Sequence, residues 1–377
     1  MPSSRVLTIV CLLGLLHLYI GLRLLPDMAL GPAGVAAAVL LLILSTVLVP
    51  AGLMSSRLKK FRRGEQVAWL GLVAMGLFSS LLVLTVLRDI VLVGATVLGV
   101  AGAGLRRASA VAVPLLAAAM SVIGYVNARR VARVVEVEVP IANLPEAFRG
   151  YSIVQISDVH VGPTIKRGYL NAIVTRVNGL KPDAIAITGD LVDGSVHSLK
   201  LHTEPLRRLA APDGAFFVTG NHEYYSGAHE WIAELRRLGL TVLLNEHVVR
   251  ERDGHGLMIA GVTDFTAHLF DRAHRSDPGR AAANAPDNVR ARILLAHQPR
   301  SAPAAAAAGF DLQLSGHTHG GQFFPWNFFV PLQQPFVAGL HRIAALWVYT
   351  SRGTGYWGPP KRFLAPSEIT RITLVPA

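Results

Sequence analysis

The sequence predicts an α-helical transmembrane region followed by an α/β domain, and three observations support this division. Long apolar runs fill residues 1–130, whereas residues 131–377 alternate short β-rich runs with amphipathic helical patterns. Apolar residues make up 51% of the 377 residues, a high share for a soluble protein. Residues 1–130 hold 12 Lys and Arg but three Asp and Glu, against 24 and 21 in residues 131–377. We therefore expect a membrane region at 1–130 and a second domain at 131–377.

Four stretches are candidates for membrane spans, because a helix needs about 20 apolar residues to cross the hydrocarbon core. They are Val6–Leu25, Gly34–Met54, Val67–Leu87 and Ala108–Tyr125. A fifth stretch, Ile90–Leu105, is shorter, rich in Gly and bounded by charged pairs. It could be a fifth span, a continuation of the third helix or a segment lying in the membrane interface.

The basic segment Ser55–Gln66 sets the expected orientation. It carries five Lys and Arg against one Glu, so the positive-inside rule places it in the cytoplasm. Four spans then put residues 131–377 in the cytoplasm, on the side that Arg129, Arg130 and Arg133 favour. Five spans would put the second domain outside. We expect a multi-pass membrane protein with four spans.

Single residues of the spans receive no functional role. The first span contains His17 and Arg23 and lacks a small-residue cleavage site, so a cleaved signal peptide is not expected. An arginine near a helix end can reach the headgroups, and a membrane histidine usually makes a helix–helix hydrogen bond. The single cysteine, Cys11, excludes an intrachain disulfide.

A transporter is not expected because the spans hold almost no buried acidic pair. A nucleic-acid partner is not expected either, because the basic residues lie mainly in the membrane region, where the bilayer is the partner.

The second domain shows a repeated pattern of strands that end in polar clusters. It begins with Val135–Val139, which alternates apolar and acidic residues as a half-buried strand does. Helical patterns such as Tyr169–Leu180 and Ala228–Leu238 separate the later strands. Five β-rich runs end in Asp, Asn or His: Tyr151–Ser157 before Asp158 and His160, Ala184–Thr188 before Asp190 and Asp193, Ala215–Thr219 before Asn221 and His222, Ile293–Ala296 before His297, and Asp311–Ser315 before His317 and His319.

This pattern predicts a metal centre, because the carboxyl ends of neighbouring strands bring distant loops to one place. Carboxylate, amide and imidazole groups suit divalent Mn, Fe or Zn, and no thiolate is available. A Gly beside Asp190, Asn221 and His317 allows the backbone to approach a metal closely.

The motifs DxH, GDxxD, GNHE, a lone His and GHTH, in this order, resemble those of the calcineurin-like metallophosphoesterase superfamily. The resemblance covers about residues 140–375, and no motif position departs from the pattern. Residues Tyr349–Tyr356 and Arg362–Thr373 also look like the membrane-attached bacterial members. The resemblance implies a four-layer αββα sandwich that hydrolyses phosphoesters with two divalent metal ions.

The resemblance also implies a role for each motif residue. It assigns Asp158, His160 and His319 to one ion, Asn221, His297 and His317 to the other, and Asp190 to both. His222 would contact the phosphate or protonate the leaving group rather than bind metal. Asp193 would orient a neighbouring ligand or histidine.

Other notable side chains have plainer interpretations. Histidines outside the motifs are expected to be satisfied polar residues: His197, His202, His229, His247, His268, His274 and His341. The run Ala302–Ala308 predicts a plain helix. An aromatic cluster follows the GHTH motif and could pack in the core or contact an acyl chain or the membrane. It consists of Phe323, Phe324, Trp326, Phe328 and Phe329.

Together these patterns lead to a functional hypothesis. We expect a membrane-anchored phosphoesterase, with Mn as the first choice of metal, acting on a phosphodiester or pyrophosphate bond in a lipid-linked or membrane-presented substrate. Some relatives by resemblance, the UDP-diacylglucosamine pyrophosphatases, act on such a glycolipid nucleotide. The alternatives are a broad phosphodiesterase or phosphatase for soluble phosphoesters and a non-catalytic membrane sensor or binding module.

Overall fold

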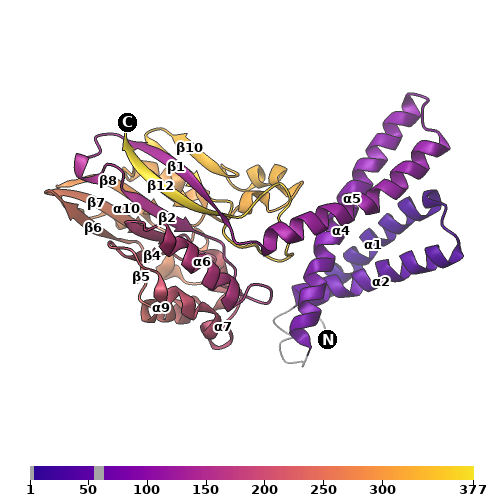
Figure 1. The fold of residues 1–377 in the computed structure, drawn as a ribbon, viewed down its shortest axis with the longest axis horizontal. Coiled ribbons are helices and arrows are strands. Elements are labelled where there is room, and N and C mark those ends of the chain that lie inside the picture. The colour runs from indigo at the N-terminus through magenta and orange to yellow at the C-terminus, as the bar shows by residue number, and fades with distance from the viewer. Residues whose placement is uncertain (1–3, 55–62) are drawn as a thin grey trace. The chain divides into compact units, whose positions relative to one another are not determined.

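The computed structural model describes residues 4–54 and 63–377 and divides into two compact units (Figure 1). The first unit contains the chain up to Arg129 together with Gly358–Phe363. The second contains Arg130–Trp357 and Leu364–Ala377. The chain therefore leaves the second unit for six residues and then returns to it. Most of the basic segment Ser55–Gln66 lies outside the described residues.

Within the described residues, the first unit has four helices that are long and apolar enough to cross a membrane. They are α1 (Ser4–Met28), α2 (Pro32–Leu53), α4 (Gly64–Val97) and α5 (Ala103–Arg129). The four predicted spans fall on these four helices. Ile90–Leu105 is no separate helix, because its first part continues α4 and its last residues begin α5.

Small and polar residues bring the helices together. Gly52 of α2 lies against Gly71 of α4 so closely that a Cβ atom on Gly71 would lie 2.2 Å from the carbonyl oxygen of Leu48. Such close contacts are typical of helix pairs in membranes. The His17 ring of α1 lies 2.9 Å, from Nε2, from the Ser45 hydroxyl of α2. His17 thus makes a helix–helix hydrogen bond.

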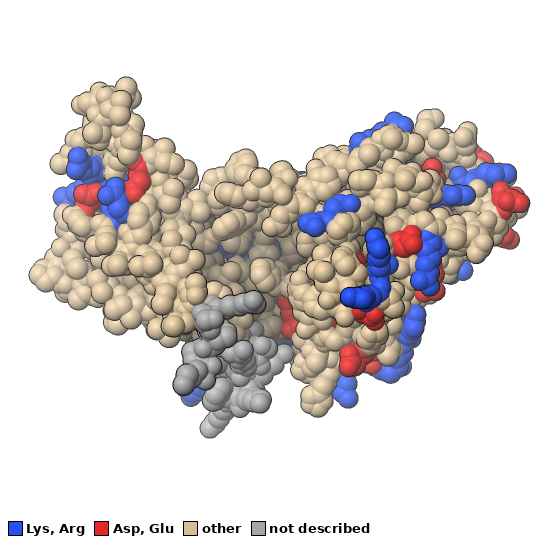
Figure 2. All heavy atoms as spheres, turned by 180° about the vertical axis from the view of Figure 1, so that it is seen from behind, with Lys and Arg blue, Asp and Glu red and all other residues tan. Residues whose placement is uncertain are grey.

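Charged side chains of α1 and α4 pair with one another. Arg23 donates from Nε to Asp89 at 2.8 Å. Arg88 is buried, bonds with Asp27, and donates to the Arg23 carbonyl oxygen at 2.8 Å. On the face shown in Figure 2, the charges of the helical unit gather mainly at one end.

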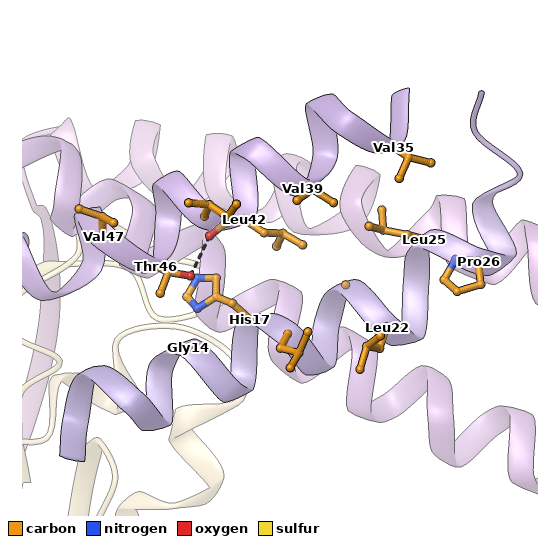
Figure 3. Close-up of a pocket in the computed structure, with 13 residues that line it drawn as sticks. Gly14, His17, Leu22, Leu25, Pro26, Val35, Val39, Leu42, Thr46 and Val47 are labelled. Carbon is orange, nitrogen blue, oxygen red and sulfur yellow. Dashed lines mark hydrogen bonds between the residues drawn. The ribbon is translucent and has the colours of Figure 1, made fainter. Parts of the chain in front are cut away.

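An apolar groove of about 590 Å³ runs between α1 and α2 (Figure 3). Leucine and valine side chains form most of its wall. The polar side chains among its described lining residues are those of His17 and Thr46, and Thr46 donates to the Leu42 carbonyl oxygen at 2.8 Å. The groove suits an apolar chain, since none of these described lining residues carries a charged side chain.

The returning segment Gly358–Phe363 packs against α4 and α5 inside the first unit. Lys361 donates from Nζ to the Gly76 carbonyl oxygen at 2.8 Å and to the hydroxyls of Ser80 and Ser121. Gly124 leaves room for this side chain, since a Cβ atom there would lie 2.7 Å from Cγ of Lys361. A segment distant in sequence thereby bridges two helices.

The second unit is built on two six-stranded sheets, ordered β1-β12-β2-β3-β4-β5 and β10-β11-β9-β8-β7-β6. One apolar core contains side chains from both sheets, such as Ile153, Phe216, Ile293 and Leu312, so the sheets pack face to face. The strands are β1 (Arg133–Ile141), β2 (Ser152–Ile156), β3 (Ala184–Ile187), β4 (Ala215–Phe217), β5 (Thr241–Val242), β6 (Glu246–Arg252), β7 (His255–Gly261), β8 (Val289–Leu295), β9 (Leu312–Ser315), β10 (Gly339–Ile343), β11 (Leu346–Thr350) and β12 (Glu368–Pro376).

Helices cover the outer faces of the sheets and complete the four layers (Figure 1). A second apolar core joins the outer face of β7, β8 and β11 to Ala302 and Ala305 of one such helix. The predicted helices at 169–180, 228–238 and 302–308 are confirmed by α6, α9 and α11. The helices of this unit are α6 (Arg167–Gly179), α7 (Val196–Thr203), α8 (Asn221–Ser226), α9 (Ala228–Arg237), α10 (Pro278–Ala282) and α11 (Ala302–Ala307).

The strand directions determine where the polar clusters lie. β2, β3 and β4 are mutually parallel in one sheet, and β7, β8 and β9 are parallel in the other. The loops after these strands consequently leave each sheet at a common edge.

Candidate active site

The five strand-end loops bring all nine predicted site residues into one cluster, most of which is buried. The loop after β2 supplies Asp158 and His160, the loop after β3 supplies Asp190 and Asp193, the start of α8 supplies Asn221 and His222, the residue pair after β8 supplies His297, and the loop after β9 supplies His317 and His319. Hydrogen bonds join the two sheets here, such as that of the His297 ring Nδ1 with the Thr188 carbonyl oxygen at 2.7 Å.

Asp158, His160 and His319 form a group that could hold one metal ion. Nε2 of His160 lies 3.1 Å from Nε2 of His319, which lies 3.4 Å from Oδ1 of Asp158. All three residues are buried. This is the set that the sequence assigned to the first ion.

Asp190, His297 and His317 form a second such group. Nε2 of His297 lies 3.2 Å from Oδ2 of Asp190 and 3.2 Å from Nδ1 of His317. The same Oδ2 lies 3.9 Å from Nε2 of His160, so Asp190 of the second group also lies close to the first. Asn221, on the adjoining turn, is buried, and its Oδ1 has no hydrogen-bond partner among the described residues.

These contacts fit a pair of divalent cations. An unpartnered buried oxygen such as Asn221 Oδ1 costs about 1–3 kcal/mol, a cost that a cation removes. Two imidazole nitrogens that face each other at 3.1–3.2 Å are in the range of two ligands of one ion. The donor set contains carboxylate, amide and imidazole groups, which suit Mn, Fe or Zn.

The backbone of the cluster is held in an unusual conformation. Five of the nine residues have positive φ angles, between 51° and 70°, a region that costs non-glycine residues free energy and is often seen at functional sites. They are Asp158, His160, Asp190, His317 and His319. Two glycines allow the loops to meet, because a Cβ atom on Gly220 or Gly316 would lie 2.2 Å from the carboxylate of Asp190 or Asp158.

The Asp193 carboxylate contacts two histidines: His160, which is an expected metal ligand, and His222. Its Oδ1 lies 3.0 Å from Nδ1 of His160 and 2.6 Å from Nδ1 of His222. Burial raises the pKa of Asp193, but the charges of the two histidines outweigh it and bring the pKa to about 2. Burial lowers the pKa of His222, but the hydrogen bond to Asp193 and the charge of Asp190 raise it to about 9. The pair forms a charge-assisted hydrogen bond that fixes the His222 ring.

Glu223 is a positioning residue whose role sequence reasoning missed. Its buried carboxylate accepts the backbone N–H groups of Asp190 at 3.0 Å, Leu191 at 2.8 Å and Gly220 at 2.7 Å. It thereby ties the loop after β3 to the start of α8. The signal in the sequence is a Glu three residues after Gly220 at a helix start, the spacing of a capping box.

Aromatic side chains that sequence reasoning also missed flank His222. The rings of Tyr225 and Trp357 lie 5.1 Å and 5.8 Å from it, between centroids, and Phe270 lies 5.5 Å from Tyr225. All three are exposed. They come from three distant segments, so no local pattern could have joined them.

The predicted aromatic cluster after the GHTH motif is mostly on the surface. Phe323 is buried, but Trp326, Phe328 and Phe329 are 44%, 67% and 52% exposed. Core packing therefore explains only Phe323. Phe324 is half-buried, and Trp326, Phe328 and Phe329 form an exposed apolar stretch that begins seven residues after His319.

A family model for calcineurin-like phosphoesterases matches residues 151–321. A protein of Danio rerio named as a transmembrane protein with a metallophosphoesterase domain is 40% identical over 267 residues, or 69% of this chain and 61% of its own length. An uncharacterized metallophosphoesterase of Campylobacter jejuni is 38% identical over 250 residues, 66% of this chain and 64% of its own length. Another, of Aquifex aeolicus, is 34% identical over 225 residues, 59% of this chain and 84% of its own length.

The relatives are thus both vertebrate and bacterial, and the chain spans about three fifths of the length of the vertebrate ones. It matches more than four fifths of the Aquifex protein. The chain therefore belongs to the calcineurin-like metallophosphoesterase family.

Proposed function

We propose that this protein is a membrane-anchored hydrolase that cleaves a phosphodiester or pyrophosphate bond with two divalent metal ions. The observation that carries the proposal is the pair of ligand groups on either side of Asp190, with His222 beside them. Asp158, His160 and His319 would hold one ion, Asn221, His297 and His317 would hold the other, and Asp190 would serve both. Mn²⁺ is the first choice among the metals that this donor set accepts.

The metal pair supplies Lewis-acid stabilisation of the phosphate oxygens and a nucleophilic water near neutral pH. The chain supplies the remaining parts. Asp193 binds Nδ1 of His222, so Nε2 is the nitrogen free to face the substrate. From Nε2 the ring donates a proton to the departing oxygen. The exposed rings of Tyr225 and Trp357 flank the His222 ring.

The first test compares metal content and activity of full-length protein in detergent. Chelation should abolish hydrolysis of bis-p-nitrophenyl phosphate, and Mn²⁺ should restore it. Asp190→Asn should bind less metal and lose most activity, because one carboxylate serves both groups. Asp253→Asn, in the β6–β7 turn, is the matched control and should behave as wild type. Near-normal activity and metal content in Asp190→Asn would refute the two-metal assignment. A wild-type protein that holds its full metal content but hydrolyses no phosphoester would favour the binding-module alternative.

We further infer that the substrate carries a lipid or is presented at the bilayer surface. Two features support this inference: the four apolar helices, and the exposed rings of Trp326, Phe328 and Phe329 after the GHTH motif. Each buried acyl methylene adds about 0.8 kcal/mol, so a few methylenes favour a lipid over its headgroup by orders of magnitude. The alternative is a broad activity on soluble phosphoesters.

A comparison of kcat/KM separates these two substrate classes. A lipid-linked pyrophosphate in detergent micelles should be hydrolysed with a higher kcat/KM than its deacylated analogue. Trp326→Ala should narrow the difference in kcat/KM between the two substrates without loss of metal. The control Leu201→Ala removes another exposed apolar side chain, on α7, and should leave this difference unchanged. Equal kcat/KM values for both substrates would replace the lipid-linked class by the soluble one.

The proposed location is a multi-pass membrane protein with a cytoplasmic catalytic domain. Four candidate spans support the multi-pass arrangement. The orientation rests on the basic residues of Ser55–Gln66 in the sequence.

A further inference from the structure

A second cluster of metal-ligand side chains lies outside the nine-residue site. It consists of His229 at the start of α9 and of Asp271 and His274 at the two ends of a short turn. Oδ2 of Asp271 lies 3.1 Å from Nε2 of His229 and 4.0 Å from Nε2 of His274. The two imidazole rings lie 5.0 Å apart between centroids. One carboxylate oxygen thus faces two imidazole nitrogens.

These separations match the donor spacing of a small tetrahedral cation. Zinc binds imidazole nitrogen and carboxylate oxygen at about 2.0–2.2 Å, which places neighbouring donors about 3.4 Å apart. The observed 3.1 Å and 4.0 Å lie on either side of that value. Two imidazoles and one carboxylate suit zinc, whereas Ca²⁺ and Mg²⁺ prefer oxygen ligands throughout.

Hydrogen bonds on the far side of Asp271 and of His274 fix the orientation of these two side chains. Oδ1 of Asp271 accepts the backbone N–H of Ala273 at 2.9 Å, which leaves Oδ2 turned toward the histidines. Nδ1 of His274 lies 2.8 Å from the Tyr224 hydroxyl, so Nε2 is the nitrogen directed at Asp271. Metal-binding carboxylates and histidines commonly have such outer partners.

The exposure of the three side chains differs in a way that suits an open metal site. The side chain of His274 is 13% exposed and that of Asp271 is 30% exposed, while that of His229 is 71% exposed. The fold therefore fixes the positions of His274 and Asp271, whereas His229 would complete the site from the surface. Solvent can reach a fourth position.

We propose that His229, Asp271 and His274 form a third metal site, which takes one zinc ion with water as the fourth ligand. The site is separate from the paired ligand groups around Asp190 and goes beyond the proposed hydrolysis. Sequence alone gave His229 and His274 no ligand role, because the two residues lie far apart in the chain and belong to no motif.

Zinc at this site would brace the wall of the catalytic pocket. The segment that carries Asp271 and His274 also carries Phe270, whose ring lies 5.9 Å from Tyr224 and 5.5 Å from Tyr225. Tyr225 in turn flanks His222. The ion would tie α9 to this segment and hold the aromatic wall in place.

The test counts zinc in matched variants of the full-length protein in detergent. Each protein is saturated with zinc, freed of unbound metal by gel filtration, and measured by mass spectrometry of the metal. Wild type should hold one more zinc per chain than His229→Ala or His274→Ala. His268→Ala is the matched control, because this exposed histidine lies in the same segment and its ring contacts a backbone carbonyl oxygen, and it should hold the wild-type amount.

Two further measurements keep the result decisive. His229 is largely exposed, so His229→Ala and wild type should have the same thermal midpoint when both are stripped of metal with a chelator, even if His274→Ala does not. The same loss of one zinc should occur in an Asp190→Asn background, which separates this site from the paired groups and from any failure of the proposed hydrolysis. Equal zinc contents in wild type, His229→Ala and His274→Ala would overturn the proposal and leave an ordinary ion pair between His229 and Asp271.

Discussion

The two nitrogens of His222 have different surroundings, and this difference determines what the residue can do. Nδ1 is hydrogen-bonded to Asp193 at 2.6 Å, while Nε2 lies 3.9 Å from Oδ2 of Asp190. Nδ1 is therefore engaged in holding the ring. Nε2 is the atom from which a proton can reach a substrate bound beside the paired ligand groups.

We expect His222→Ala to lose about 10²–10⁴ in kcat, the usual range for a lost acid–base group. The loss should be larger for an alkyl phosphodiester than for a p-nitrophenyl ester, because an aryl oxide departs without a proton. Metal content should stay at the wild-type value. Steady-state kinetics with both esters, together with metal analysis, check these outcomes.

A large drop in bound metal in His222→Ala would instead make the residue a ligand. Equal losses for both leaving groups would argue against proton donation. Asp193→Asn offers a graded comparison, because it weakens the hold on Nδ1 without removing the ring.

The residues of the site divide into those that local sequence could predict and those that it could not. Asp158, Asp190 and His297 follow buried strands within a few positions, so the sequence could predict that they lie at strand ends, where the two packed sheets bring them together. Trp357 reaches His222 only through the packing of a segment that is distant in the sequence. No local pattern in the sequence records that packing.

At the scale of elements, α4 shows why the end of a helix is hard to predict in a membrane protein. Arg88 and Asp89 look like the polar boundary of a span, and the stretch after them, Ile90–Leu105, stayed undecided because it is short, rich in Gly and bounded by charged pairs. In the structure both charges are paired, with Asp27 and Arg23, so the helix continues to Val97. Charged residues within membrane helices are commonly paired, so a charged pair alone does not mark the end of a helix.

The contact between α2 and α4 gives a prediction about packing. Gly71→Ala should destabilise the helical unit by about 1–3 kcal/mol, the usual cost of overpacking, because the new Cβ atom would lie 2.2 Å from the Leu48 carbonyl oxygen. Gly94→Ala in the same helix is the control, since a Cβ atom there meets no atom of the described residues within 4 Å. Both changes alter helix propensity alike, so their difference in thermal midpoint isolates the packing contact.

Circular dichroism of the full-length variants in detergent measures this difference. A lower midpoint for Gly71→Ala than for Gly94→Ala is the expected result. The same midpoint in both variants would show that α2 and α4 are not held together at this glycine.

At the scale of the whole molecule, an even number of spans returns the chain to the side from which it started. Four candidate spans therefore put the segment after α2 and the segment after α5 on one side. Reporter fusions after Arg63 and at Ala377 should both give cytoplasmic signals. A cytoplasmic signal after Arg63 with an external one at Ala377 would require an odd number of crossings between them.

The six residues Gly358–Phe363 have a consequence for how such a protein can evolve. They are encoded within the catalytic half, yet Lys361 makes its hydrogen bonds with Gly76, Ser80 and Ser121 of the helices. A recombination event that joined residues after 130 to foreign helices would keep the lysine and lose its partners. The two halves are thus not interchangeable modules, and changes around Gly124 and Lys361 should be inherited together.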